Sequence, residues 1–108
     1  MGEFNFNTKT LHAGHEVDKT QGTRAVPIYQ STAYVFNSAE HAANLFSLAE
    51  PGYIYTRLNN PTNDVLEQRL AALEGGIAAV STASGTSAIA TALMVLLKAG
   101  DHIVATNS

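Results

Sequence analysis

The stretch that decides the fold runs from Ile77 to Ala99 and reads IAAVSTA, SGTS, AIATALMVLLKA. Its first part, Ile77 to Ala83, is short and apolar and predicts a strand that is covered on both faces. Gly85 lies in a small polar turn, and the nearly all-apolar residues Ser87 to Ala99 predict a buried helix. Because the first N–H groups of a helix have no partner within it, this order of elements predicts a site for an anion such as phosphate.

A second apolar segment, His102 to Thr106, follows Gly100 and predicts a parallel neighbour for the first strand. Two such strands joined by a helix form a right-handed βαβ unit. The sequence therefore predicts an α/β fold with a mostly parallel sheet. Because one such unit would be a poor independent domain, we expect the 108-residue chain to be part of a longer protein.

The turn around Gly85 lacks the residues of three familiar motifs. Thr82 and Thr86 stand where a nucleophile elbow needs glycine, a dinucleotide fingerprint needs two further glycines, and a Walker loop needs a lysine. Two interpretations remain open. Either the N–H groups of Gly85 and Thr86 hold a phosphate with a hydroxyl from Ser84, or the turn is a capped helix start without a ligand.

Two further helices are expected before this stretch. Asn60 and Pro61 form a typical helix start, and leucines at helical spacing predict a helix that ends at Gly75. Ser38 can cap another helix over residues 39 to 50. These caps predict where each helix begins.

Residues 1 to 24 show neither the period of a helix nor that of a strand. Residues 25 to 36 are rich in β-branched and aromatic side chains and predict an extended edge segment, whereas residues 1 to 24 predict an irregular arm. His12 and His15 have a spacing that metal ligands use. Because Gly14 separates them in a segment without helical pattern, we expect a hydrogen-bonded loop and no metal.

Tyr53, Tyr55 and Arg57 alternate along one segment, so an extended chain would place them on one face. The planar guanidinium of Arg57 suits a phosphate or carboxylate, and a tyrosine adds a hydroxyl donor. A surface strand whose arginine pairs with a neighbouring acid is the alternative interpretation. The spacing alone leaves both open.

Composition argues against several classes of protein. Six Lys and Arg against nine Asp and Glu give a formal net charge of −3, which offers no surface for nucleic acid. No cysteine is present for a disulfide or a thiolate metal site. The apolar run from Ala88 to Leu97 is too short for a membrane span, and the first residues lack the pattern of a secretory signal. We therefore expect a cytoplasmic protein with no nucleic-acid or membrane partner.

Three motifs together resemble the start of the Cys/Met-metabolism family of pyridoxal-phosphate (PLP) enzymes. They are RAVPIYQSTAYVF at residues 24–36, GYIYTRLNNPTNDVLEQRLAALEGG at 52–76 and ASGTSAI at 83–89. The first motif and HAANLFSL at residues 41–48 are most similar to O-acetylhomoserine sulfhydrylases. Methionine γ-lyases, cystathionine γ-synthases and cystathionine γ-lyases share the same early pattern.

The resemblance implies a fold-type-I, aspartate-aminotransferase-like architecture. Residues 1–60 would form an N-terminal arm on the neighbouring subunit, and residues 61–108 would begin the PLP-binding large domain of a homotetramer built from tight dimers. Gly85 and Thr86, with Ser84 beside them, match the positions that hold the phosphate of PLP. Tyr55 and Arg57 match the pair that reaches the neighbouring subunit's phosphate.

The resemblance also implies a reaction, in which the acetate of O-acetyl-L-homoserine is replaced by sulfide or a thiol to give homocysteine or methionine. Methionine γ-lyase or cystathionine γ-synthase or γ-lyase chemistry is the alternative. The Schiff-base lysine of the family has no match among Lys9, Lys19 and Lys98, so we expect no catalytic residue in this chain. A non-catalytic fragment that only docks on a partner chain is the alternative of another class.

Overall fold

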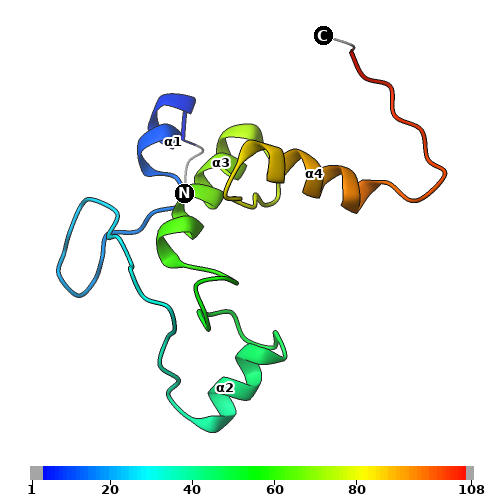
Figure 1. Cartoon of the computed structure of the whole chain (residues 1–108). Helices are drawn as coiled ribbons and strands as arrows, with labels where there is room; N and C mark the ends of the chain where they lie inside the picture. The colour runs from blue at the N-terminus through cyan, green and yellow to red at the C-terminus, as the bar shows by residue number, and fades with distance from the viewer. Residues whose placement is uncertain (1–3, 107–108) are drawn as a thin grey trace.

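The computed structural model describes residues 4–106 and contains four helices in that range, shown in Figure 1. They are α1 (Phe6–His12), α2 (Ala39–Phe46), α3 (Pro61–Glu74) and α4 (Gly85–Leu96). Irregular segments join them, and α1 lies against α3 while α2 lies at one end of the molecule. Residues 1–3 of the expected arm and 107–108 of the expected large domain lie outside the described residues.

Helix α3 begins and ends where the sequence predicts. The side chain of Asn60 accepts the N–H of Thr62 at 2.9 Å, and Pro61 occupies the first turn, where its missing N–H costs nothing. Gly75 ends the helix in the left-handed conformation, with φ +69°, and its N–H donates to the carbonyl of Ala71. Local capping residues therefore suffice to define this helix.

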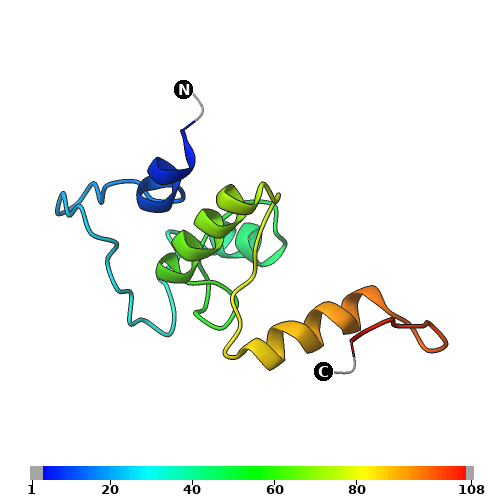
Figure 2. The same ribbon diagram turned by 90° about the horizontal axis from the view of Figure 1, so that it is seen from above.

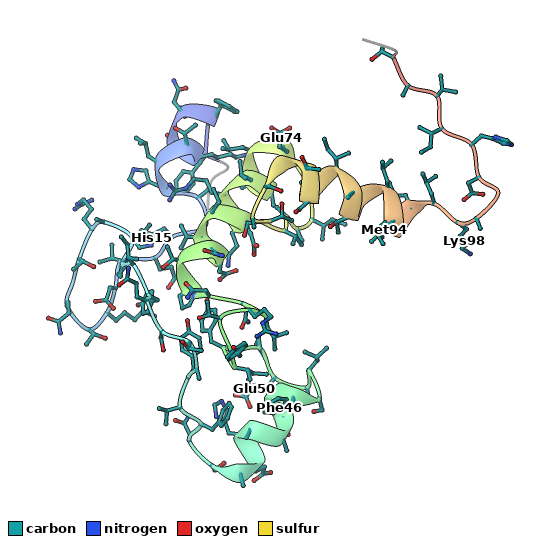
Figure 3. The ribbon with its side chains drawn as sticks, in the orientation of Figure 1. His15, Phe46, Glu50, Glu74, Met94 and Lys98 are labelled. Carbon is teal, nitrogen blue, oxygen red and sulfur yellow. The ribbon has the colours of Figure 1, made fainter. Side chains whose placement is uncertain are left out.

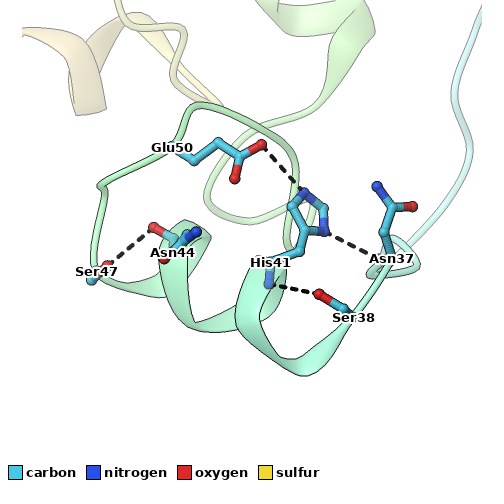
Figure 4. A network of polar contacts seen from close by, with 6 residues as sticks. All are labelled: Asn37, Ser38, His41, Asn44, Ser47 and Glu50. Atoms are coloured by element: carbon cyan, nitrogen blue, oxygen red, sulfur yellow. Dashed lines mark hydrogen bonds and ion pairs between the residues drawn. The ribbon is translucent and has the colours of Figure 1, made fainter.

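Helix α2 begins after Ser38, whose Oγ accepts the N–H of His41 at 3.0 Å. It ends before the predicted Glu50, because Leu48 adopts a left-handed conformation with φ +59°. His41 Nε2 lies 3.9 Å from Glu50 Oε1, and its Nδ1 accepts the N–H of Asn37 at 3.1 Å, as Figure 4 shows. These contacts fold the residues after α2 back toward its first turn.

Helix α1 lies where the sequence predicts an irregular arm, so that prediction was wrong for this segment. Asn5 caps the helix, since its Oδ1 accepts the N–H of Thr8 at 3.0 Å and the hydroxyl of Thr8 at 2.9 Å. The arm is also held on α3, because Arg69 Nε donates to the carbonyl of Ala13 at 2.9 Å. Gly14 follows with φ +72°. Helix α1 therefore forms although its residues lack a helical period, because a cap stabilises its start and a contact distant in sequence holds the arm on α3.

The predicted strand pair is not present in the described residues. Residues 77–83 and 102–106 have no strand assignment, and the β-structure described is a single bridge between Ala33 and Tyr55. A strand requires a hydrogen-bonded neighbour, and a parallel pair further requires that its connecting helix pack on the sheet. Figure 2 shows that α4 and the residues after it lie away from α3 instead.

The helix that the sequence predicts as buried, α4, is exposed along its whole length. It begins at Gly85, two positions before the predicted Ser87, and side chains such as Met94 extend into open space in Figure 3. The buried apolar side chains of the described residues are Leu45 and Ala71, both remote from α4 in sequence. The apolar pattern of α4 therefore indicates a surface that these residues leave uncovered. Among residues 4–106, no helix has the length and apolar character to cross a membrane.

Candidate functional site

The turn before α4 has the hydrogen bonds of a capped helix start. Ser84 Oγ accepts the N–H of Ser87 at 3.1 Å and lies 3.0 Å from the Ser87 hydroxyl. Thr82 Oγ1 donates to the carbonyl of Ser84 at 2.9 Å. The cap leaves the N–H groups of Gly85 and Thr86 without a hydrogen-bond partner among the described residues. Two aligned donors therefore remain at the positive end of the helix dipole.

This turn is open to solvent. Ser84, Gly85 and Thr86 are all exposed, and a Cβ atom at Gly85 would meet no atom within 4 Å. Gly85 also lacks the positive φ that favours glycine elsewhere in the chain. Neither backbone conformation nor packing in the described residues requires glycine there, whereas close approach of a bound group to the backbone would. The turn accordingly fits a phosphate.

Tyr55 and Arg57 form the second predicted half of the site. Arg57 Nη2 donates to the Tyr55 hydroxyl at 3.3 Å, and the guanidinium carbon lies 5.3 Å from the centre of the Tyr55 ring. Arg57 is exposed and has no acidic partner among residues 4–106. These residues therefore do not form the alternative arrangement, in which the arginine pairs with a neighbouring acid. The pair borders a hollow of about 410 Å³ lined by residues 29–32 and 55–57.

Tyr53 does not share a face with this pair, contrary to the prediction from spacing. Its hydroxyl donates instead to Asp64 Oδ2 on α3 at 3.0 Å. Burial, together with the hydrogen bond and the charge of Asp64, raises the pKa of Tyr53 to about 12. The chain turns after Tyr55, whose carbonyl accepts the N–H of Leu58 at 2.8 Å, so the two-residue alternation of a strand does not hold here.

The two predicted halves are not joined within one chain. The hollows that Tyr55 and Arg57 line are bordered by residues of the 29–36 and 54–58 segments and by Phe46, and by none from the turn before α4. No hydrogen bond or ion pair connects the halves among the described residues. Both groups nevertheless keep hydrogen-bond donors that have no partner among the described residues.

Asn60 has contacts that reasoning from the sequence missed. It was predicted as a helix cap, but its amide nitrogen also donates to the carbonyl of Tyr29 at 2.9 Å and to Thr56 Oγ1 at 3.1 Å. With 5% of its surface exposed, it is the buried polar side chain of the described residues. The one available signal was its position, directly after the Tyr-x-Arg run and before Pro61 and Thr62.

The two histidines of the arm do not form a metal site with their neighbours. The part of the chain that the structure describes contains no group of three or more His, Cys, Asp or Glu able to hold a metal ion. His12 and His15 line a cleft of about 760 Å³ between the arm and α3, where His15 Nε2 is buried without a hydrogen-bond partner (His15 is labelled in Figure 3).

Comparison with known proteins gives consistent matches. The family described as Cys/Met metabolism PLP-dependent enzyme matches residues 7–108. The chain is 58% identical over 102 residues to homocysteine synthase of Schizosaccharomyces pombe and 61% identical over 101 residues to O-acetyl-L-homoserine sulfhydrylase 1 of Thermus thermophilus. Each alignment covers 94% of this chain and 24% of the relative. The chain thus spans about a quarter of the length of these relatives.

Solved structures show the same likeness. An O-acetylhomoserine (thiol)-lyase of Campylobacter jejuni, solved with N'-pyridoxyl-lysine-5'-monophosphate, matches with a TM-score of 0.85 and 50% identity over 91% of this chain and 24% of that one. Cystathionine gamma-lyase of Lactobacillus plantarum matches with a TM-score of 0.74 and 34% identity over 92% of this chain and 23% of that one. These matches confirm the expected fold type. The predicted sheet and the predicted contacts of the arm with a neighbouring subunit stay predictions.

Proposed function

Because the chain belongs to the Cys/Met metabolism PLP-dependent enzyme family, we propose that the complete protein replaces the acetate of O-acetyl-L-homoserine by sulfide or a thiol. The identity of 58–61% to homocysteine synthase and O-acetyl-L-homoserine sulfhydrylases carries this proposal. The products would be acetate and homocysteine, or methionine when methanethiol is the nucleophile. We further propose that the enzyme is a cytoplasmic homotetramer.

We propose that PLP is held by its phosphate at the start of α4. The unpaired N–H groups of Gly85 and Thr86 support this role, because a dianion gains from both donors and from the helix dipole. The Ser84 hydroxyl caps the helix through Ser87 and so fixes the direction of these donors. When bound, PLP supplies an electron sink for carbanion chemistry at the substrate.

We propose that Tyr55 and Arg57 bind the phosphate held by the turn of a neighbouring subunit. The exposure of Arg57 and its lack of an acidic partner among residues 4–106 support this, since a guanidinium fork and a phenol suit phosphate oxygens. Their separation from the chain's own turn is consistent with a site completed between two subunits. Residues 1–60 would then act as the arm that contacts the neighbour.

Elimination is the second candidate reaction, because L-methionine gamma-lyase of Fusobacterium nucleatum is 51% identical over 102 residues. The two reactions differ in what they need besides O-acetylhomoserine. Acetate release by the complete protein should be measured with and without sulfide. Release that requires sulfide and yields homocysteine supports replacement, whereas equal release without sulfide would contradict it.

The remaining alternative is a fragment that only docks on a partner chain. None of the three lysines matches the family's Schiff-base position, so we propose that catalysis depends on residues outside these 108. Under our proposal the complete protein binds PLP stoichiometrically and shows its visible absorbance. A complete protein without that absorbance after incubation with PLP would favour the docking fragment.

A further inference from the structure

The first turn of α3 holds the backbone of Tyr29 from both sides. The N–H of Tyr29 donates to Thr62 Oγ1 at 2.9 Å, and the carbonyl of Tyr29 accepts the amide of Asn60 at 2.9 Å. Thr62 Oγ1 donates in turn to the carbonyl of Pro27 at 3.0 Å. Two side chains that are two positions apart thus fasten a segment that lies more than thirty residues earlier in the sequence. We call these contacts the Asn60–Thr62 clamp.

The clamp extends to the residue between Tyr55 and Arg57. The amide of Asn60 also donates to Thr56 Oγ1 at 3.1 Å, and the Thr56 hydroxyl donates to the carbonyl of Ser31. The backbone N–H of Thr56 donates to the carbonyl of Thr32 at 2.9 Å. Thr56 is therefore fixed through both its side chain and its backbone. Tyr55 and Arg57, its neighbours in sequence, are therefore attached to a fixed backbone. These two residues form the proposed phosphate-binding pair.

The two ends of the Asn60 amide have different partners. The oxygen caps α3 by accepting the N–H of Thr62, whereas the nitrogen makes both clamp contacts. A helix cap alone needs only an acceptor, and serine or aspartate would supply one. The buried amide nitrogen is thus a feature that capping does not explain, and an unmade hydrogen bond at a buried site is costly.

We propose that Asn60 and Thr62 are positioning residues for phosphate recognition by Tyr55 and Arg57. The clamp holds the 27–32 segment and Thr56 in register, so that the Arg57 guanidinium is presented beside the hollow that these segments line. The inference rests on the proposed role of Arg57 toward PLP. Its specific consequence is that loss of the clamp weakens binding of the phosphate and spares the rest of the cofactor.

Asn60→Asp and Thr62→Val separate the clamp from the cap. Aspartate keeps the acceptor oxygen and loses the amide donors, and valine removes the Thr62 hydroxyl while leaving its backbone N–H available to Asn60. Asn63→Asp is a matched control, because Asn63 is exposed in the same helical turn and its side chain has no hydrogen bond among the described residues. If Asn60→Asp fails to fold, Thr62→Val tests the same clamp.

The experiment titrates the complete apoprotein with PLP and, separately, with pyridoxal, which lacks the phosphate. We expect both clamp variants to weaken PLP binding about tenfold and to leave pyridoxal binding within about twofold. In an Arg57→Ala background, Asn60→Asp should weaken PLP binding by much less than tenfold, because a positioning residue acts mainly through the arginine and only Tyr55 remains to be positioned.

Equal losses for PLP and pyridoxal, or additive losses in the Arg57→Ala background, would show a general structural role and overturn the inference. If Arg57→Ala weakens PLP binding while both clamp variants bind it normally, the inference fails and the proposed function of Arg57 stands. If Arg57→Ala itself leaves PLP binding unchanged, the proposed role of Arg57 and the clamp inference fail together.

Discussion

The guanidinium of Arg57 lies over the ring of Tyr55, with Cζ 5.3 Å from the ring centre and Nη2 3.3 Å from the phenol oxygen. The aromatic ring and the hydroxyl together restrict a side chain that would otherwise sample many rotamers. The other guanidinium donors have no partner among residues 4–106. Arg57 is thus partly preorganised, as the proposed contact with the phosphate of a neighbouring subunit requires.

Arg57→Ala should reduce the affinity of the complete protein for PLP. Each charge-assisted hydrogen bond contributes about 1.5–3 kcal/mol, so we expect a loss of about tenfold to a hundredfold in affinity. Equilibrium titration of the apoprotein measures it. Arg24→Ala is the matched control, because Arg24 is exposed and its side chain makes no hydrogen bond or ion pair among the described residues. Unchanged affinity in Arg57→Ala would contradict the assigned role.

Tyr55→Phe should have a smaller effect than Arg57→Ala. The variant removes the oxygen that receives the Arg57 Nη2 hydrogen bond but keeps the ring beneath the guanidinium. We expect a loss of about threefold to tenfold in PLP affinity, because the variant loses one hydrogen bond while the charge of Arg57 remains. A loss as large as that of Arg57→Ala would mean that the hydroxyl, rather than the guanidinium, dominates phosphate binding.

Local capping signals in the sequence predicted where helices α2 and α3 begin. Asn60 with Pro61 and Gly75 marked both ends of α3, and Ser38 marked the start of α2, because a cap acts within three residues of itself. The same logic extends to α1, which Asn5 caps, but the absence of an apolar period hid it. Capping chemistry can thus be recognised from sequence even where tertiary packing cannot.

Features that depend on distant residues could not be predicted in this way. The contact of Asn60 with Tyr29 joins positions 31 apart, and the position of Asn60 before Pro61 does not indicate which distant residue it meets. The strand expected at residues 77–83 needs a neighbour to form its ladder, and the described residues provide none. For the candidate site, the resemblance of three motifs predicted a PLP-dependent family, which the family match confirms, whereas spacing misplaced Tyr53 and the phosphate contacts stay predictions.

Gly85→Ala should preserve the fold and impair PLP binding. A Cβ at Gly85 meets no atom within 4 Å and the residue lacks a positive φ, so alanine costs nothing locally and gains up to about 1 kcal/mol of helix propensity. The added methyl would crowd a phosphate that approaches the backbone N–H. PLP titration and thermal unfolding of the apoprotein measure the two effects. Gly76→Ala, with ordinary contacts, is the control. Normal PLP binding by Gly85→Ala would count against this turn as the phosphate site.

Gly14→Ala should detach the arm from α3. A Cβ at Gly14 would lie 2.8 Å from Gln68 Cβ and 2.9 Å from both Arg69 N and Val65 O, and the backbone is already at φ +72°. We expect destabilisation of more than about 2 kcal/mol, measured by denaturant unfolding. Gly22→Ala isolates the conformational part, because its φ is +67° but its Cβ would meet no atom within 4 Å. Equal losses in the two variants would show that packing of the arm on α3 contributes nothing.

The raised pKa of Tyr53 makes stability depend on alkaline pH. Burial and the neighbouring Asp64 favour the protonated phenol and raise the pKa of Tyr53 in the folded state from the usual 10.0 to about 12. The native state therefore holds its proton more tightly, so this contribution to stability is complete below pH 10 and is lost as the pH rises toward 12. Unfolding free energies across this range should fall less steeply for Tyr53→Phe than for the unmodified protein. Asp64→Asn should lower the pKa of Tyr53, measured by phenolate absorbance, because it removes the negative charge 3.0 Å from the hydroxyl. Identical alkaline slopes for Tyr53→Phe and the unmodified protein would contradict this coupling.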